Sequence, residues 1–140
     1  MSVKNQNQIK VRVYYEDTDS GGIVYHSKYL NFAERGRTEF LRRKNLEQQI
    51  IKEKFGMVFV VKSLNIHYLS FACLDDLLVI KTVICDLNKA KVNFQQFISK
   101  KKLIIAKIKV TVCCIDKNRK ISRMNDKMYD TLKKIGKETI

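Results

Sequence analysis

The residues best suited to chemistry lie in one short stretch, residues 14–29, with the sequence YYEDTDSGGIVYHSKY. The carboxylates of Glu16, Asp17 and Asp19 come first, and a pair of glycines and His26 follow them. A carboxylate can attack a carbonyl carbon or activate a water molecule. The start of a helix offers free backbone N–H groups, which can polarise a carbonyl or hold an anion. A helix that begins near His26 would bring both kinds of group together.

The same residues also have purely structural uses. Asp17 and Asp19 are of a type that is common in turns and at helix caps. Tyr15 and Tyr25 can be ordinary core or rim aromatics, and His26 can be hydrogen-bonded locally at a helix start. Residue types alone therefore leave the catalytic and the structural interpretation open.

Hydrophobic periodicity predicts the elements that position this stretch. Apolar and polar residues alternate over residues 9–15, which predicts a strand leading into the acidic turn. Over about residues 26–52 the apolar spacing becomes helical, and this is the only long helix expected. The remaining prediction is four strands, at residues 57–69, 77–87, 92–100 and 103–115, and a short helix at about 125–134.

Short connections between the strands favour antiparallel pairing. The expected fold is therefore α+β, with one long helix packed against an antiparallel sheet of about five strands. Small residues on the helix, such as Gly36, would let the sheet approach closely. One helix covers only one face of such a sheet. Residues such as Lys107 and Lys109 would leave the second face exposed to solvent, or a second subunit would cover the exposed edge strands.

Composition narrows the class of protein. The chain has 140 residues, one ordinary domain, and a formal net charge of +14. Such a charge suits an anionic ligand, an anionic membrane surface, or simply a lysine-rich solvated surface. Its four cysteines form no CxxC pair, so no metal site is predicted. The polar N-terminal residues predict a cytoplasmic protein.

Residues 11–42, VRVYYEDTDSGGIVYHSKYLNFAERGRTEFLR, closely resemble the opening of the Tol-Pal-associated acyl-CoA thioesterases. This YbgC family is related to 4-hydroxybenzoyl-CoA thioesterase within the hotdog superfamily. The family pattern is YxDTDxxGxVYHxxY, followed by a helix with an ER-R-E run. Ser20 and Gly36 depart from its commonest form. The matching residues are Tyr15, Asp17, Thr18, Asp19, Gly22, Val24, Tyr25, His26, Tyr29, Glu34, Arg35, Arg37 and Glu39.

The resemblance implies a single hotdog thioesterase domain over residues 1–140, whose sheet wraps around the central helix. It implies hydrolysis of an acyl-CoA to free acid and CoA without a cofactor. Asp19 would act as nucleophile or general base. The backbone N–H at the helix start, at His26 with Tyr25 beside it, would polarise the thioester carbonyl. Glu34 is the second candidate carboxylate, because some hotdog thioesterases use a helix glutamate.

The resemblance also implies substrate contacts and partners. Gly22 and Tyr15 belong to the matching motif and are assigned to substrate binding. Lys91 lies in a region where related enzymes meet CoA phosphates. Active sites of this family lie at subunit interfaces, so a homodimer or homotetramer is expected.

Other interpretations stay open. The acyl group can be carried by an acyl carrier protein instead of CoA. The chain can be a non-catalytic hotdog subunit that binds lipid, the inner-membrane surface or an envelope partner. A nucleic-acid-binding module fits the charge, but its motifs are missing and the basic residues are spread along the chain. No nucleic-acid partner is therefore expected.

Overall fold

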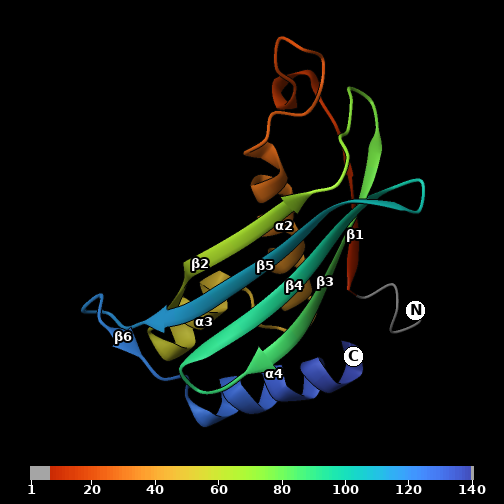
Figure 1. Ribbon diagram of the computed structural model, residues 1–140. Helices are drawn as coiled ribbons and strands as arrows, with labels where there is room; N and C mark the ends of the chain where they lie inside the picture. Colours follow the sequence, from red (N-terminus) through yellow and green to blue (C-terminus); the bar gives the residue numbers. More distant parts are fainter. Residues whose placement is uncertain (1–6, 140) are drawn as a thin grey trace.

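The structure is a computed structural model that describes residues 7–139, in which a curved antiparallel sheet wraps around helix α2 (Lys28–Arg42; Figure 1). The strands are β1 (Gln8–Arg12), β2 (Val58–Tyr68), β3 (Leu77–Leu87), β4 (Lys91–Lys100), β5 (Leu103–Ile115) and β6 (Ile121–Ser122). Their order is β1-β3-β4-β5-β2, and the short β6 pairs with the end of β5. The predicted α+β architecture is confirmed, and β2 to β5 begin and end within one residue of their predicted bounds.

The prediction of one long helix over residues 26–52 is wrong. Helix α2 ends at Arg42, and a separate helix, α3 (Gln48–Phe55), follows. Asn45 adopts a left-handed conformation with φ +60°, and the N–H of Leu46 donates to the carbonyl of Leu41 at 2.9 Å. These are the features of a Schellman motif, which ends a helix. Asparagine tolerates this conformation better than most residues, so Asn45 was the signal for the break.

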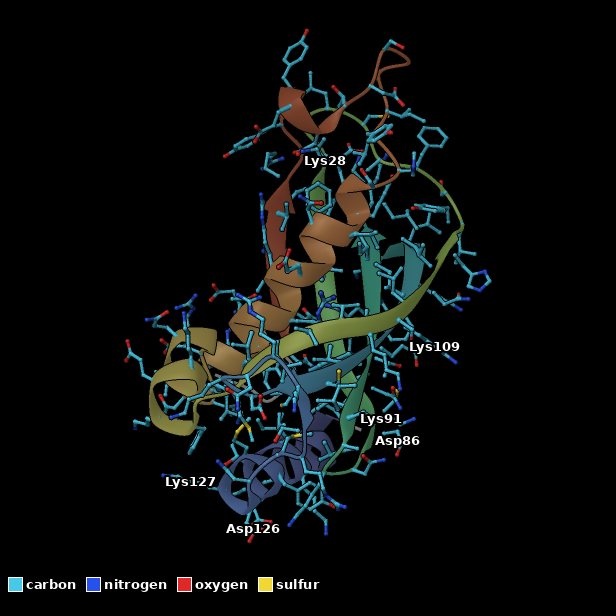
Figure 2. The ribbon with its side chains drawn as sticks, turned by 90° about the vertical axis from the view of Figure 1, so that its left-hand side faces the viewer. Lys28, Asp86, Lys91, Lys109, Asp126 and Lys127 are labelled. Carbon is cyan, nitrogen blue, oxygen red and sulfur yellow. The ribbon has the colours of Figure 1, made fainter. Side chains whose placement is uncertain are left out.

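The two ends of the chain also differ from prediction. β1 stops at Arg12, and Tyr15–Asp17 forms a short 3-10 helix, η1, where the strand was expected to continue. The predicted C-terminal helix exists, but α4 (Asp126–Thr139) is 14 residues long, nearly as long as α2. In Figure 2, Asp126 lies at the opposite end of the molecule from Lys28, the first residue of α2. None of the described helices is long and apolar enough to cross a membrane.

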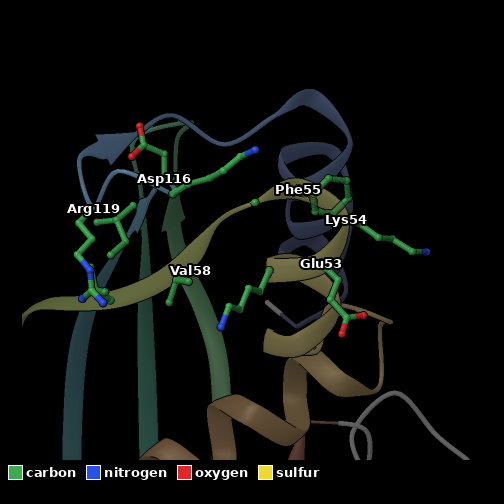
Figure 3. Close-up of a pocket in the computed structure, with 11 residues that line it drawn as sticks. Glu53, Lys54, Phe55, Val58, Asp116 and Arg119 are labelled. Carbon is green, nitrogen blue, oxygen red and sulfur yellow. The ribbon is translucent and has the colours of Figure 1, made fainter.

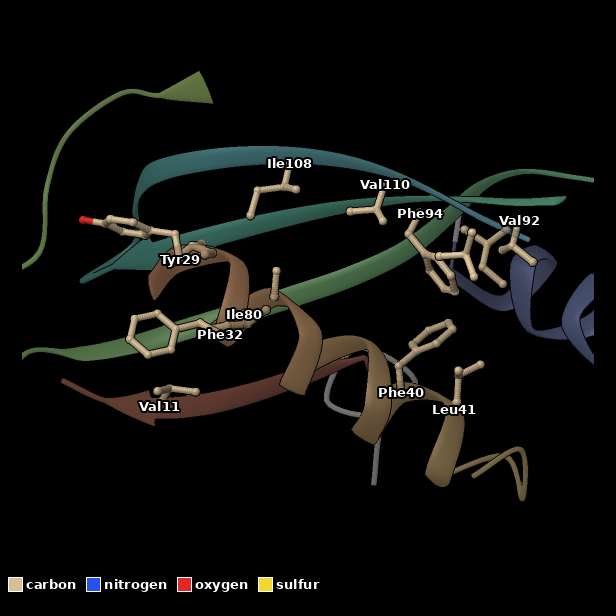
Figure 4. Close-up of a cluster of buried hydrophobic side chains, with 14 of the residues drawn as sticks. Val11, Tyr29, Phe32, Phe40, Leu41, Ile80, Val92, Phe94, Ile108 and Val110 are labelled. Carbon is tan, nitrogen blue, oxygen red and sulfur yellow. The ribbon is translucent and has the colours of Figure 1, made fainter. Parts of the chain in front are cut away.

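The core lies between α2 and the concave face of the sheet. Phe32 and Phe40 on α2 are buried there together with Ile80 and Phe94 of the sheet (Figure 4). The helix and sheet approach closely at Gly36, where an added Cβ would lie 2.6 Å from Cγ2 of Ile80. The expected close approach at this glycine is therefore confirmed.

The sheet face opposite α2, here called the outer face, is exposed to solvent. Lys81 on β3 pairs with Phe97 on β4, which pairs with Lys107 on β5, so a half-buried ring lies between two exposed lysines. Lys109 is exposed on the same face. None of these lysines forms an ion pair with a carboxylate of the described residues.

Candidate active site

The acidic turn is anchored by Asp17, which is only 5% exposed. Its Oδ2 accepts a hydrogen bond from the N–H of Tyr14 at 2.8 Å. Its backbone carbonyl accepts one from the N–H of Tyr25, also at 2.8 Å. Asp17 therefore joins the end of β1 to the segment that begins α2, and its role is structural.

Asp19 lies on the exposed side of the same turn. Its Oδ1 accepts the N–H of Gly21 at 2.8 Å, and its own N–H donates to the carbonyl of Ile23 at 2.9 Å. Gly22 has φ +80°, a conformation that favours glycine, and its N–H donates to the Asp19 carbonyl at 3.0 Å. Oδ2 of Asp19 has no hydrogen-bond partner among the described residues, so the turn presents an accessible carboxylate oxygen.

The segment before α2 supplies a free backbone donor. The carbonyl of Tyr25 accepts the N–H of Lys28 at 2.9 Å, but the N–H of Tyr25 already donates to Asp17. The N–H groups of His26 and Ser27 donate to no acceptor among the described residues. The donor expected at the helix start is thus available at His26 and not at Tyr25. The ring of Tyr25 lies against the His26 ring, with 4.4 Å between centroids.

Two tyrosines hold the helix start in place. The hydroxyl of Tyr68, the last residue of β2, donates to the carbonyl of His26 at 2.8 Å. The buried hydroxyl of Tyr29 accepts the N–H of Ala72 at 3.0 Å. Burial raises the pKa of both tyrosines, so both hydroxyls stay protonated at neutral pH. Tyr68 and Ala72 were missed from the sequence because only tertiary packing brings them to the site.

The loop between β2 and β3 closes the other side of the turn. Ile23 forms an isolated bridge with Cys73, whose N–H donates to Oδ2 of Asp76 at 2.7 Å. The same oxygen of Asp76 lies 2.9 Å from Nζ of Lys100. Burial opposes ionisation of Asp76, but these two partners outweigh burial and hold its pKa below the usual range. The ion pair between Asp76 and Lys100 therefore holds the loop that pairs with the acidic turn. The local motif gave no sign of this ion pair.

The remaining predicted residues are Tyr15 and Lys91. Tyr15, in η1, is 81% exposed. Lys91 pairs with Cys113 at the other end of the sheet, and Figure 2 shows it far from Lys28. One chain therefore brings together Asp19, His26, Tyr25 and Gly22 but leaves Lys91 distant.

A cavity of about 200 Å³ lies along α2 on the concave side. The guanidinium of Arg37 lies beside it and donates to Oε1 of the buried Gln96 at 2.8 Å. Burial lowers the pKa of Arg37, and the nearby Glu34 opposes that shift. The cavity is lined by Glu34, Arg37, Thr38, Leu41, Phe59, Val60, Val61, Phe94 and Val112.

The arrangement suits hydrolysis of a carbonyl compound, since an accessible carboxylate and a free N–H belong to one turn and the helix start that it joins. The described residues contain no group of three or more His, Cys, Asp or Glu side chains placed to hold a metal ion. The turn and the helix start supply a carboxylate and an oxyanion donor.

A family model for the thioesterase-like superfamily matches residues 13–132. The chain belongs to the thioesterase-like superfamily. Within it, the acyl-CoA thioesterase YbgC of Haemophilus influenzae is 48% identical over 106 residues, 76% of this chain and 78% of the relative. This match confirms the resemblance to the YbgC family.

Two further proteins match most of this chain. The long-chain acyl-CoA thioesterase FadM of Escherichia coli is 30% identical over 135 residues, 94% of this chain and 99% of the relative. The crystal structure of a probable thioesterase from Bartonella henselae has a TM-score of 0.80 and 35% identity, over 84% of this chain and 98% of that one. The hotdog architecture is thereby confirmed.

Proposed function

We propose that this chain hydrolyses an acyl-CoA thioester to a free acid and CoA, with Asp19 as nucleophile or general base. The proposal rests on the difference between the two aspartates of the DTD turn. Asp17 is buried and hydrogen-bonded, whereas Asp19 keeps an accessible oxygen, and the N–H of His26 at the following helix start is free. The activity named for the YbgC and FadM relatives supports the same chemistry.

In this mechanism the thioester carbonyl oxygen accepts the His26 N–H, which stabilises the negative charge that develops during attack. Asp19 either attacks the carbonyl carbon, which expels the CoA thiolate and leaves an anhydride for water to hydrolyse, or removes a proton from a water molecule that attacks the carbonyl carbon directly. A thiolate leaves readily, so no strong acid is needed for the leaving group. We assign the Tyr25 ring, the turn at Gly22 and the exposed ring of Tyr15 to contacts with the substrate.

We infer that the working unit is at least a homodimer. Strand β2 is an edge of the sheet, and three of its apolar residues are exposed: Val61 at 47%, Leu64 at 45% and Tyr68 at 44%. An exposed apolar edge strand is suited to pairing with another strand. The cavity along α2 is lined partly by β2, so a second copy paired there would form a further wall for the acyl group.

An acyl carrier protein is the second candidate carrier of the acyl group. The outer face carries Lys81, Lys107 and Lys109 without described ion pairs, so an acidic protein would find a complementary surface. The cytoplasmic location and the link to the Tol-Pal envelope system stay predictions from the sequence.

The first experiment is thiol release from a panel of acyl-CoAs, with wild type and Asp19→Asn measured in parallel. We expect the variant to lose at least a hundredfold in kcat, which corresponds to about 2.7 kcal/mol of barrier. Glu16→Gln is the matched control, because it removes an exposed carboxylate three residues away and should leave the rate within about twofold.

Each outcome separates the candidates. Activity on carrier-protein thioesters alone would replace CoA with the protein carrier. Equal activity in wild type and Asp19→Asn would remove Asp19 from the mechanism and make Glu34 the next carboxylate to test. A wild type that is inactive on every thioester would favour a binding subunit.

A further inference from the structure

Two cavities border strand β2, and Val60 lines both of them. The wider one, of about 840 Å³, lies between α3, the start of β2 and the turn that joins β5 to β6, and Figure 3 shows Glu53 and Lys54 on its α3 side. The narrower one, of about 200 Å³, borders α2, the helix that begins beside His26. A substrate bound at the start of α2 therefore has the narrower cavity on its own helix.

An apolar strip on β2 leads from the start of α2 to this narrower cavity. Tyr68 lies at one end of the strip, where its hydroxyl donates to the carbonyl of His26. Leu64 and Val61 follow along the strand, and Val61 lines the cavity. The β5 partners of all three strip residues are buried, and paired residues point to the same face of a sheet, so the strip faces α2. Leu64 and Val61 are exposed, so an apolar chain can contact them along this path.

Arg37 supplies the cationic group of the cavity, and Gln96 holds that group in place. Nη1 of Arg37 donates to Oε1 of Gln96 at 2.8 Å. Gln96 is fully buried, and its Nε2 donates to the carbonyl of Ala33 at 2.7 Å and to Oγ1 of Thr82 at 2.9 Å. Both amide hydrogens of Gln96 are therefore used, which turns Oε1 toward Arg37 and fixes the guanidinium.

The positive charge of Arg37 has no counter-ion within residues 7–139. No described carboxylate forms an ion pair with it, and apart from the bond to Gln96 its N–H groups donate to no described acceptor. Burial of the guanidinium lowers its pKa, which reflects the cost of keeping the charge there. Glu34 also lines the cavity, but it is exposed, so solvent screens its charge more strongly. An anionic group that enters the cavity would supply a counter-ion for Arg37.

The rest of the cavity wall is mostly apolar. Figure 4 shows Leu41 on α2 and Phe94 on β4, which form part of this wall. A carboxylate at the end of an apolar chain matches both parts of the site, because its two oxygens can accept paired N–H groups of the guanidinium. A chain that ends in a methyl group would bury the guanidinium further without a partner, which is unfavourable.

We propose that this cavity favours acyl groups whose far end carries a carboxylate, so that the substrates are thioesters of dicarboxylic acids and Arg37 contacts the free carboxylate. The inference rests on the proposed function, because it names the class of acyl group that is hydrolysed at Asp19. Arg37 lies nine residues after Lys28, about 14 Å along the helix axis. Longer dicarboxylic chains should therefore reach it, and the shortest should not.

The first test uses the wild-type protein alone. The CoA thioesters of succinic, adipic, suberic and sebacic acid are each compared with the methyl-ended acyl-CoA of the same number of carbons. We expect no advantage for the succinyl group, and a kcat/KM about tenfold higher for the carboxylate-ended member at the suberyl or sebacyl length. A wild type that hydrolyses methyl-ended chains equally well or better at every length would overturn the inference.

The second test replaces the charge in Arg37→Met, which keeps an unbranched apolar stem. The ratio of kcat/KM between the carboxylate-ended and methyl-ended members should fall about tenfold. A purely structural role of Arg37 would lower kcat/KM for both members alike and leave this ratio unchanged. Arg37→Met deprives the buried Gln96 of a donor, so the melting temperature is measured as well, and Arg37→Lys, which keeps a positive charge, should retain part of the preference.

Arg35→Met is the matched control. Arg35 lies on the same helix and is exposed, with its guanidinium 5.9 Å from the centroid of the Phe32 ring, and it does not line the cavity. The ratio between the two kinds of substrate should equal that of wild type. A folded Arg37→Met variant that also keeps the wild-type ratio would overturn the inference.

Failure of the inference can be told apart from failure of the proposed function. A wild type that is inactive on every thioester would remove both. A wild type that is active without a preference for the carboxylate would overturn the role of Arg37 and leave hydrolysis at Asp19 standing. A carboxylate of a second copy that pairs with Arg37 would also overturn it, and Arg37→Met would then change the oligomeric state and not the ratio.

Discussion

Asp17 and Asp19, two aspartates separated by one residue, lie in different environments. The carboxylate of Asp17 is buried and bonded to Tyr14, so it fixes the turn, while Asp19 keeps an accessible oxygen. The sequence predicted the cluster and, by resemblance, the role of Asp19. It did not predict that the N–H of Tyr25 is engaged by Asp17, because that depends on how the turn closes.

We expect Asp76 to make the free energy of unfolding depend on pH in the acid range. Its pKa is lowered in the folded chain because its bonds to the Cys73 N–H and to Lys100 outweigh burial. A carboxyl with a lowered pKa stabilises the fold above its unfolded pKa of about 4, and this contribution disappears as the pH falls through the folded value. Asp76→Asn should therefore lower the free energy of unfolding at pH 7 by about 1 kcal/mol and by much less near pH 3.

Urea denaturation at the two pH values measures this difference. Asp75→Asn is the control, since Asp75 is exposed and its left-handed conformation, φ +71°, suits asparagine. An Asp76→Asn cost that is as large at pH 3 as at pH 7 would contradict the charged role of Asp76.

At the scale of elements, alternation of apolar residues was sufficient to predict β2 to β5. It failed where a single residue overrides periodicity. Asn45 ends α2 although the apolar pattern continues, and the bond between Asp17 and Tyr14 ends β1 early. Such breaks come from local hydrogen bonds to side chains and from positive φ, which hydrophobic spacing does not register.

Replacement by alanine should have opposite effects on stability at Gly36 and at Gly136. A Cβ on Gly36 would lie 2.6 Å from Ile80 Cγ2, so Gly36→Ala should force helix and sheet apart and cost about 1–3 kcal/mol. A Cβ on Gly136 of α4 would lie 3.7 Å from Ile84, an ordinary contact. Gly136→Ala should then stabilise the protein by up to about 1 kcal/mol through helix propensity.

Chemical denaturation of both variants measures the two effects side by side. A stabilised Gly36→Ala variant would mean that propensity outweighs the contact with the sheet, and the close approach of α2 would not be required for the fold.

At the scale of the whole molecule, most of what supports the site could not be predicted from the sequence. Tyr68, Ala72 and Lys100 are distant from Asp19 along the chain and carry no motif of their own. Folding of the sheet around α2 brings them to the acidic turn. The same folding places Lys91 at the far end of the chain's own sheet, so its predicted role requires a second copy.

If β2 forms the dimer interface, a charged side chain introduced on this strand should separate the two chains. Leu64→Lys should place a charge in the interface and produce a monomer, detected by light scattering after gel filtration, and acyl-CoA hydrolysis should fall although Asp19 is intact. Leu103→Lys is the control, because Leu103 is equally apolar and 59% exposed but lies on β5. A Leu64→Lys variant that stays dimeric and active would place the interface elsewhere.

The hydrogen bond from Tyr68 to the His26 carbonyl has a consequence for kinetics at low enzyme concentration. Tyr68 ends the strand that we assign to the interface, and its hydroxyl donates to the carbonyl of His26, whose N–H we propose polarises the substrate. Dilution favours separate chains by mass action and would loosen this support. Turnover per chain should then fall as the enzyme is diluted, so the velocity would rise more steeply than linearly with enzyme concentration.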